Sequence, residues 1–221
     1  MNFDGLIFDF DGVLLESEFI GNQHLADLLT ELGHETTVRD AVTQFVGLSG
    51  ENFIAAVSNW IGRDVPDAFF EARRAEDERV MREGIMEVVG AVRFVETLPV
   101  ELPKAIASSS STQWIRTHLT HLGLAETFEP HIYSGREHVT NGKPAPDIYH
   151  HAAQAIGVDI SNAVIIEDSP VGATGAVASG AFVIGLAAGR HCQDGHDVLL
   201  KDKGVHAIAH SFEDVQRILF G

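Results

Sequence analysis

The chain has 221 residues, enough for a large hydrophobic core in one domain or in a core with an insertion. Its formal charge of −17 argues against non-specific binding to nucleic acid or to an anionic membrane, and its 45% apolar content argues against wholesale disorder. Cys192 is the single cysteine, which excludes an internal disulfide and fits a reducing compartment.

The sequence also lacks the patterns of membrane insertion and export. No apolar stretch approaches the length of a membrane span, and the N-terminus enters a strand without a signal-peptide pattern. We therefore expect a cytoplasmic protein, a monomer or weak homo-oligomer, with neither nucleic acid nor membrane among its partners.

The first predicted element is a strand within residues 3–8 that is buried on both faces, as in the middle of a parallel sheet. Asp9 closes this strand, Asp11 follows, and Gly12 allows a sharp turn. Two carboxylates this close repel each other. Because Mg²⁺ prefers oxygen ligands, the pattern predicts a magnesium site at the end of the strand.

Apolar residues at helical spacing then predict three helices. One contains Leu25–Leu32, the second starts near Ser49, and the third follows Pro66 and stops at Gly84. A further helical segment, 88–98, precedes the next strand. The two strand ends are roughly 95 residues apart, whereas a βαβ crossover needs only about a dozen. The excess predicts a helical insertion of residues 16–87 into an α/β core formed by 1–15 and 88–221.

The remainder of the chain alternates strand and helix. We predict strands at 104–108, 131–134, 163–166, 181–184 and 206–208, and helices at 112–122, 147–156 and 171–179. This alternation predicts an α/β fold with a doubly wound parallel sheet, whose ligands bind at the carboxyl ends of the strands. The glycines of the 171–179 helix would let it pack close to the sheet.

Polar side chains gather at that edge of the predicted sheet. The set is Asp9 and Asp11, Ser108, Lys143, and Glu167 with Asp168. Each one alone has an ordinary explanation, since serines and acidic residues cap helices and a lysine beside prolines can lie on a surface loop. Together they supply carboxylates, a hydroxyl and a lysine, which is what phosphoryl transfer through an aspartyl intermediate requires.

Four motifs resemble those of the haloacid dehalogenase-like superfamily of phosphotransferases. They are DFDGVL at 9–14, Ser108, Lys143 within KPAPDIY, and EDS at 167–169. The resemblance covers essentially the whole chain and implies a Rossmann-like core. The predicted insertion resembles the small helical cap of the β-phosphoglucomutase and phosphoglycolate phosphatase branch.

This resemblance implies a role for each residue. Asp9 would be the nucleophile, Asp11 the general acid and base, and Lys143 the cation that neutralises developing charge. Phosphate would be held by Gly12, Ser108, Ser109 and Lys143. Mg²⁺ would be held by Asp9, Asp11 (through its backbone carbonyl), Glu167 and Asp168. Dehalogenation is disfavoured, because a carboxylate at position 11 serves an alcohol leaving group that needs a proton.

Three functions remain open from the sequence. A phosphatase acting on a small phosphorylated metabolite is favoured, with a sugar or sugar-acid phosphate as first guess and phosphoglycolate as second. A sugar-phosphate mutase would need a cap histidine and arginine where this chain has Gly21 and Gly50, although His24 lies one helical turn away. A non-catalytic protein that binds phosphorylated metabolites would not need Asp11.

Substrate selection is expected to fall to the cap and its linker. The candidates are Glu16, Ser17, His24, Ser49 and Asn52. By contrast, His191, Cys192 and His196 follow no zinc-ligand spacing, and we predict an ordinary surface loop there.

Overall fold

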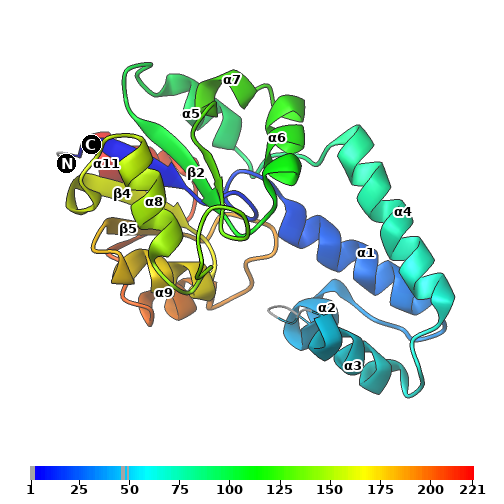
Figure 1. The fold of residues 1–221 in the computed structure, drawn as a ribbon. Helices are drawn as coiled ribbons and strands as arrows, with labels where there is room; N and C mark the ends of the chain where they lie inside the picture. Colours follow the sequence, from blue (N-terminus) through cyan, green and yellow to red (C-terminus); the bar gives the residue numbers. More distant parts are fainter. Residues whose placement is uncertain (1–2, 46–47, 49) are drawn as a thin grey trace. The chain divides into compact units, whose positions relative to one another are not determined.

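The computed structural model describes residues 3–45, 48 and 50–221. The chain divides into two compact units, which we describe separately (Figure 1). The core unit holds the chain up to Ser17 and from Ile85 onwards, and the helical unit holds Glu18–Gly84. Among the described residues, no helix combines the length and apolarity needed to cross a membrane.

The core unit is built on one six-stranded, fully parallel sheet with the order β3-β2-β1-β4-β5-β6. The strands are β1 Gly5–Phe8, β2 Lys104–Ser108, β3 Ile132–Ser134, β4 Ala163–Glu167, β5 Phe182–Leu186 and β6 Ala207–Ala209. The predicted α/β class and parallel sheet are confirmed. β1 lies between β2 and β4, as its two buried faces indicated.

Helices flank this sheet. They are α5 Ala91–Thr97, α6 Thr112–His121, α7 Ala125–Phe128, α8 Asp147–Ala155, α9 Pro170–Ala178, α10 His196–Lys201 and α11 Phe212–Phe220, with a 3₁₀ turn at Ile160–Asn162. The predictions for α6, α8 and α9 are confirmed to within a residue or two. Helix α11 was not predicted from the sequence, although Ser211 caps it by accepting from the Asp214 backbone N–H.

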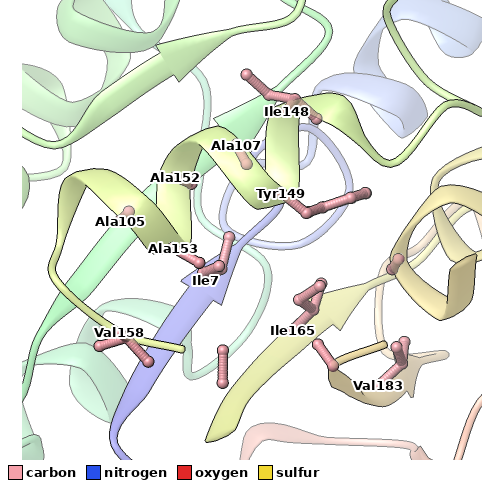
Figure 2. Close-up of a cluster of buried hydrophobic side chains, with 13 residues drawn as sticks. Ile7, Ala105, Ala107, Ile148, Tyr149, Ala152, Ala153, Val158, Ile165 and Val183 are labelled. Atoms are coloured by element: carbon pink, nitrogen blue, oxygen red, sulfur yellow. The ribbon is translucent and has the colours of Figure 1, made fainter. Parts of the chain in front are cut away.

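One face of the sheet is covered by α8 and α9 (Figure 2). Alternate strand residues, including Ile7, Ile165 and Val183, pack there with Tyr149 and small residues of α8. A side chain at Gly175 of α9 would have its Cβ 2.8 Å from the Pro144 carbonyl oxygen. Gly175 thus lets α9 approach the backbone of residues 144–145 closely, whereas the sequence analysis predicted close packing against the sheet.

Aromatic side chains pack on the opposite face. The Phe8 ring lies edge-on to Phe94, at 6.3 Å between ring centroids, and to Phe128, at 5.6 Å. Phe94 in turn contacts Phe212 of α11 at 5.2 Å. β1 therefore has core on both sides, which fixes the strand that leads into Asp9.

The helical unit contains four helices, of which the first starts at the unit boundary. They are α1 Ser17–Glu31, α2 Val38–Phe45, α3 Gly50–Ile61 and α4 Asp67–Glu83. Their own core includes Leu25, Leu29, Phe45, Val57 and Phe69. Helices α1, α3 and α4 were predicted from the sequence, and α2 was not.

The two passages of the chain between the units are held together within the core unit. Leu15 forms an antiparallel bridge with Glu87. The Glu16 N–H donates to the Met86 carbonyl at 3.0 Å, and the Val88 N–H donates to the Leu14 carbonyl at 3.1 Å. The helical unit thus leaves and re-enters the core at one short two-stranded contact.

Candidate active site

The carboxyl ends of three neighbouring strands bring the predicted polar residues together. Phe8 of β1 pairs with Ile106 of β2 and with Ile166 of β4. The next residues along these strands are Asp9, Ala107 and Glu167, and Ser108 ends β2. Parallel register therefore places Asp9 in the middle, with the hydroxyl on one side and the carboxylates on the other.

Lys143 lies at the centre of this group. Its Nζ is 2.6 Å from Asp9 Oδ1 and 2.6 Å from Glu167 Oε1, and its side chain is 5% exposed. Burial opposes the charge on this lysine, but the carboxylates of Asp9 and Glu167 outweigh burial and raise the pKa of Lys143 well above its usual range. Lys143 is therefore a fixed cation rather than a proton donor.

Glu167 is fully engaged by neighbouring donors. Besides Lys143, its Oε1 accepts from the Tyr149 hydroxyl at 2.8 Å. Its Oε2 accepts from the backbone N–H of Ser169 at 3.0 Å and from the Ser169 hydroxyl at 3.1 Å. A Cβ at Gly172 would overlap this carboxylate, so glycine is required there. Four donors leave Glu167 little room for a further ligand.

Asp9, Glu167 and Asp168 form a buried cluster whose carboxylate oxygens lie within 4.8 Å of one another. Burial, followed by repulsion from Glu167, raises the pKa of Asp9 well above its usual range. The single positive charge of Lys143 does not balance the negative charge of three ionised carboxylates. An all-oxygen donor set with excess negative charge fits Mg²⁺.

The Asp11 carboxylate has its hydrogen-bond partners outside this cluster. Its Oδ1 accepts from the Ser17 hydroxyl at 2.7 Å and from the Trp114 indole N–H at 3.0 Å. Its Oδ2 accepts from the hydroxyls of Ser110 at 2.6 Å and Ser108 at 3.3 Å. These donors hold the carboxylate beside the predicted phosphate-binding serine and leave the cluster to other ligands.

Gly12 and Ser109 were predicted to hold phosphate, and this stays a prediction. The backbone at Gly12 has φ +81°, and a Cβ there would overlap the Asp168 carboxylate, so only glycine fits. The Gly12 N–H donates to the Leu15 carbonyl at 2.7 Å. A phosphate contact through this N–H requires that bond to break. Ser109 is exposed at the carboxyl end of β2.

The substrate-selecting candidates lie in different places. Glu16 is 1% exposed, and both of its carboxylate oxygens accept from the Arg190 backbone N–H at 3.1 Å. This side chain therefore holds the loop at Arg190 in place within the core unit. Ser17 donates to Asp11. His24 is half-buried and Asn52 exposed, both in the helical unit, and Ser49 lies outside the described residues. Selection by His24, Ser49 and Asn52 stays a prediction.

The loop at 191–196 is exposed at 193–195, as a surface loop should be, but its two histidines pack inward, which the sequence analysis did not predict. His191 Nε2 lies 2.9 Å from Asp168 Oδ2, and His196 Nε2 lies 2.6 Å from the Asp168 backbone oxygen. His191, Cys192 and His196 are half-buried, and burial raises the pKa of the Cys192 thiol to about 12. The loop therefore packs against Asp168, which spacing along the sequence did not reveal.

Sequence reasoning also missed Ser110, Trp114 and Tyr149. Ser110 lies in the connection from β2 to α6 and Trp114 in the first turn of α6, where parallel topology brings side chains toward the sheet edge. That position was a usable signal for both residues. Tyr149 belongs to KPAPDIY, but its role in holding Glu167 depends on how α8 packs on the sheet.

His118 of α6 makes a pH-dependent contribution to stability. Its side chain is fully buried, and its ring centroid lies 4.2 Å from that of Trp114. Burial lowers the pKa of His118 to about 4. Between pH 6.5 and 4 His118 is therefore protonated in the unfolded chain but neutral in the native protein. The free energy of unfolding falls as pH falls through this range. From pH 7.5 to 5 this loss is about 2 kcal/mol.

Replacing His118 with Leu should remove that loss. We expect the decrease in unfolding free energy between pH 7.5 and 5, measured by urea denaturation, to be smaller in His118→Leu than in the native chain. The exposed His150→Leu is the matched control and should behave like the native chain. An equal pH dependence in the two variants would contradict the assignment.

Comparison with known proteins agrees with this arrangement. The profile of a family described as "Haloacid dehalogenase-like hydrolase" matches residues 6–186. A structure of a HAD family hydrolase from Deinococcus radiodurans R1, with bound phosphate and sodium, superposes with a TM-score of 0.88 at 29% identity. The superposition covers 99% of this chain and 95% of that one.

Curated relatives carry similar sequences. Validoxylamine A 7'-phosphate phosphatase of Streptomyces hygroscopicus subsp. limoneus is 28% identical over 89% of this chain and 92% of its own. The 6-phosphogluconate phosphatase of Escherichia coli K12 is 25% identical over 85% of this chain and 84% of its own. The chloroplastic protein SUPPRESSOR OF QUENCHING 1 of Arabidopsis thaliana is 36% identical over 79% of this chain, but that match spans only 17% of the plant protein.

Proposed function

Because the chain belongs to the haloacid dehalogenase-like hydrolase family, we propose that it is a Mg²⁺-dependent phosphatase of small phosphorylated metabolites, acting through an aspartyl-phosphate intermediate. The observation that carries the proposal is the contact of Lys143 with Asp9 and Glu167 inside a buried carboxylate cluster. A structural ion pair would need one carboxylate, whereas this site concentrates several around one lysine.

The cluster offers Asp9 and Asp168 as side-chain ligands for Mg²⁺, with the Asp11 backbone carbonyl as a third. Glu167 already accepts from Lys143, Tyr149 and Ser169, which favours contact through water over direct ligation. When bound, the ion would supply positive charge that lets an anionic phosphate approach an anionic nucleophile.

Asp9 would attack phosphorus and carry the phosphoryl group. Its other contacts prepare it for this step, since Lys143 holds Oδ1 at 2.6 Å and fixes the carboxylate orientation. The Lys143 charge would also stabilise negative charge that develops on the transferred group. The Ser108 hydroxyl would exchange Asp11 for a phosphate oxygen as its acceptor.

Asp11 would give a proton to the leaving alcohol and then take one from the water that hydrolyses the aspartyl-phosphate. Ser17, Ser110 and Trp114 orient its carboxylate beside Ser108. Proton transfer by Asp11 would thus run in one direction in the first step and in the opposite direction in the second. This alternation also distinguishes an enzyme from a protein that only binds phosphate.

Changing Asp11 to Asn tests that role through the leaving group. For a sugar phosphate we expect kcat/KM to fall by about 10²–10⁴, because an alkoxide needs the proton. For p-nitrophenyl phosphate, whose leaving group needs none, kcat/KM should fall by less than about tenfold. Equal losses for the two substrates would argue that Asp11 supports the fold and not proton transfer.

A sugar or sugar-acid phosphate is the proposed substrate class, supported by the 6-phosphogluconate phosphatase relative, and phosphoglycolate is the second choice. The experiment is phosphate release from a panel of phosphorylated metabolites, with Mg²⁺ and with chelator. We expect release from a few sugar phosphates that stops when the chelator is added.

Two other results would overturn the proposal. Interconversion of sugar phosphate isomers, dependent on an added bisphosphate, would indicate a mutase. Binding of phosphorylated sugars without either reaction would indicate a non-catalytic protein. Release that persists after complete metal removal would contradict the Mg²⁺ dependence alone.

A further inference from the structure

The loop that joins β5 to α10, with the first residue of that helix, brings three metal-ligating side chains together. His191, Cys192 and His196 each offer one ligand atom, and these atoms lie within 4.8 Å of one another. All three side chains are half-buried, so they remain open to ions from solvent. Two of these residues are adjacent in sequence and His196 follows His191 by five positions, which is no familiar metal-ligand spacing. The fold of the loop is what brings them together.

The separation between Cys192 Sγ and a histidine nitrogen suits one tetrahedral ion. Cys192 Sγ lies 3.4 Å from His191 Nε2. Sulfur and nitrogen ligands at about 2.3 and 2.05 Å from Zn²⁺, at a tetrahedral angle, are about 3.6 Å apart. The observed distance therefore needs a shift of only a few tenths of an ångström to accept an ion.

The loop is held in shape by backbone hydrogen bonds. The Cys192 N–H donates to the Gly189 carbonyl at 2.9 Å, and the His196 N–H donates to the Gln193 carbonyl at 2.9 Å. Glu16 fixes the start of the loop by accepting from the Arg190 N–H. Because the ligands are already positioned, binding an ion orders few further groups.

The donor chemistry differs from that of the neighbouring carboxylates. Asp9, Glu167 and Asp168 offer only oxygen, which suits Mg²⁺, whereas a thiolate with two imidazoles selects zinc-class ions. We propose that His191, Cys192 and His196 form a second metal site, for a divalent ion of the zinc class with water as fourth ligand. The sulfur releases its proton to solvent as it binds.

A metal ion bound by His191, Cys192 and His196 would also change the contact between His191 and Asp168. His191 Nε2 lies 2.9 Å from Asp168 Oδ2. If this nitrogen binds the ion, it no longer donates a hydrogen bond to Asp168. The metal site itself requires no catalytic activity, so its test is independent of the proposed phosphatase function.

Titration of the full chain with Co²⁺ tests the proposal. Cobalt bound to thiolate gives a charge-transfer absorption band, and Cys192 is the only cysteine in the chain. Cobalt held by carboxylates alone gives no such band. We expect the band to saturate at one equivalent per chain, and Zn²⁺ to displace the cobalt and abolish it.

Variants identify the ligands. Cys192→Ser should lose the band, and His196→Gln should bind Co²⁺ at least tenfold more weakly. The exposed His150→Gln is the matched control and should bind within twofold of the native chain. Melting curves verify that each variant is folded.

Three results would overturn the proposal of this metal site. The first is the absence of a band at tenfold excess Co²⁺. The second is saturation at half an equivalent, which would mean that two chains share the ion through their cysteines. The third is unchanged affinity in a folded His196→Gln.

Discussion

Replacing Asp9 with Asn is expected to reduce turnover of any phosphate ester by at least about 10⁴-fold, since an amide oxygen cannot form the acyl-phosphate. The fold should survive. Asp9 is buried beside Glu167 and Asp168, and the raised pKa of Asp9 shows that its charge is unfavourable there. The melting temperature in chelator should therefore stay the same or rise.

The measurement is phosphate release alongside a thermal melt of the same preparation. A folded Asp9→Asn protein with more than about 1% of native turnover would contradict the nucleophile assignment. Intact-mass measurement provides a second readout, because an aspartyl-phosphate adds a phosphoryl group to the native chain and none to the variant. Incubation with substrate and quenching in acid would trap that species.

Replacing Lys143 with Met is expected to cost about 3–5 kcal/mol of unfolding free energy as well as activity. The methionine fills similar space but leaves Asp9 and Glu167 without their buried cation. Urea denaturation in chelator measures the loss, because a bound metal ion would partly replace the missing charge.

A double variant separates charge from packing. Adding Glu167→Gln to Lys143→Met removes one of the stranded carboxylates while keeping its volume, and should recover part of the lost stability. Glu167→Gln alone keeps the pair between Lys143 and Asp9 and should cost less than Lys143→Met. If the double variant shows the summed loss of the two single ones, the lysine acts through packing and not through charge.

The fold was predictable wherever a local pattern matched the final packing. Residues 5–8 form a fully apolar run with core on both sides, so its burial could be predicted without knowing its neighbours. Gly123 and Gly157 follow the ends of α6 and α8 closely, and both have positive φ. Helix α2 was missed although Val38, Ala41 and Phe45 recur at helical spacing, because its eight residues are fewer than the roughly 11–18 over which such a period is usually judged.

The site was predictable in its acids and its lysine but not in its supporting contacts. Asp9 and Glu167 directly follow or end apolar strands, so parallel topology alone brings them together. Trp114 contacts Asp11 across 103 positions of sequence, and His191 contacts Asp168 from a loop without periodicity. Such contacts depend on side-chain directions that spacing does not encode.

The paired passages at Leu14–Glu16 and Met86–Val88 make the helical unit exchangeable. Backbone hydrogen bonds hold the two ends of the helical unit together at these passages. The entropy cost of closing a chain segment grows slowly with its length, by about 0.6 kcal/mol per doubling, so the length of the helical unit has little effect on the stability of the core. The unit can therefore lengthen, shorten or be replaced by one from a relative while the carboxylates and Lys143 stay in register. The sequence of the helical unit and that of the carboxylate edge can then change independently within one chain.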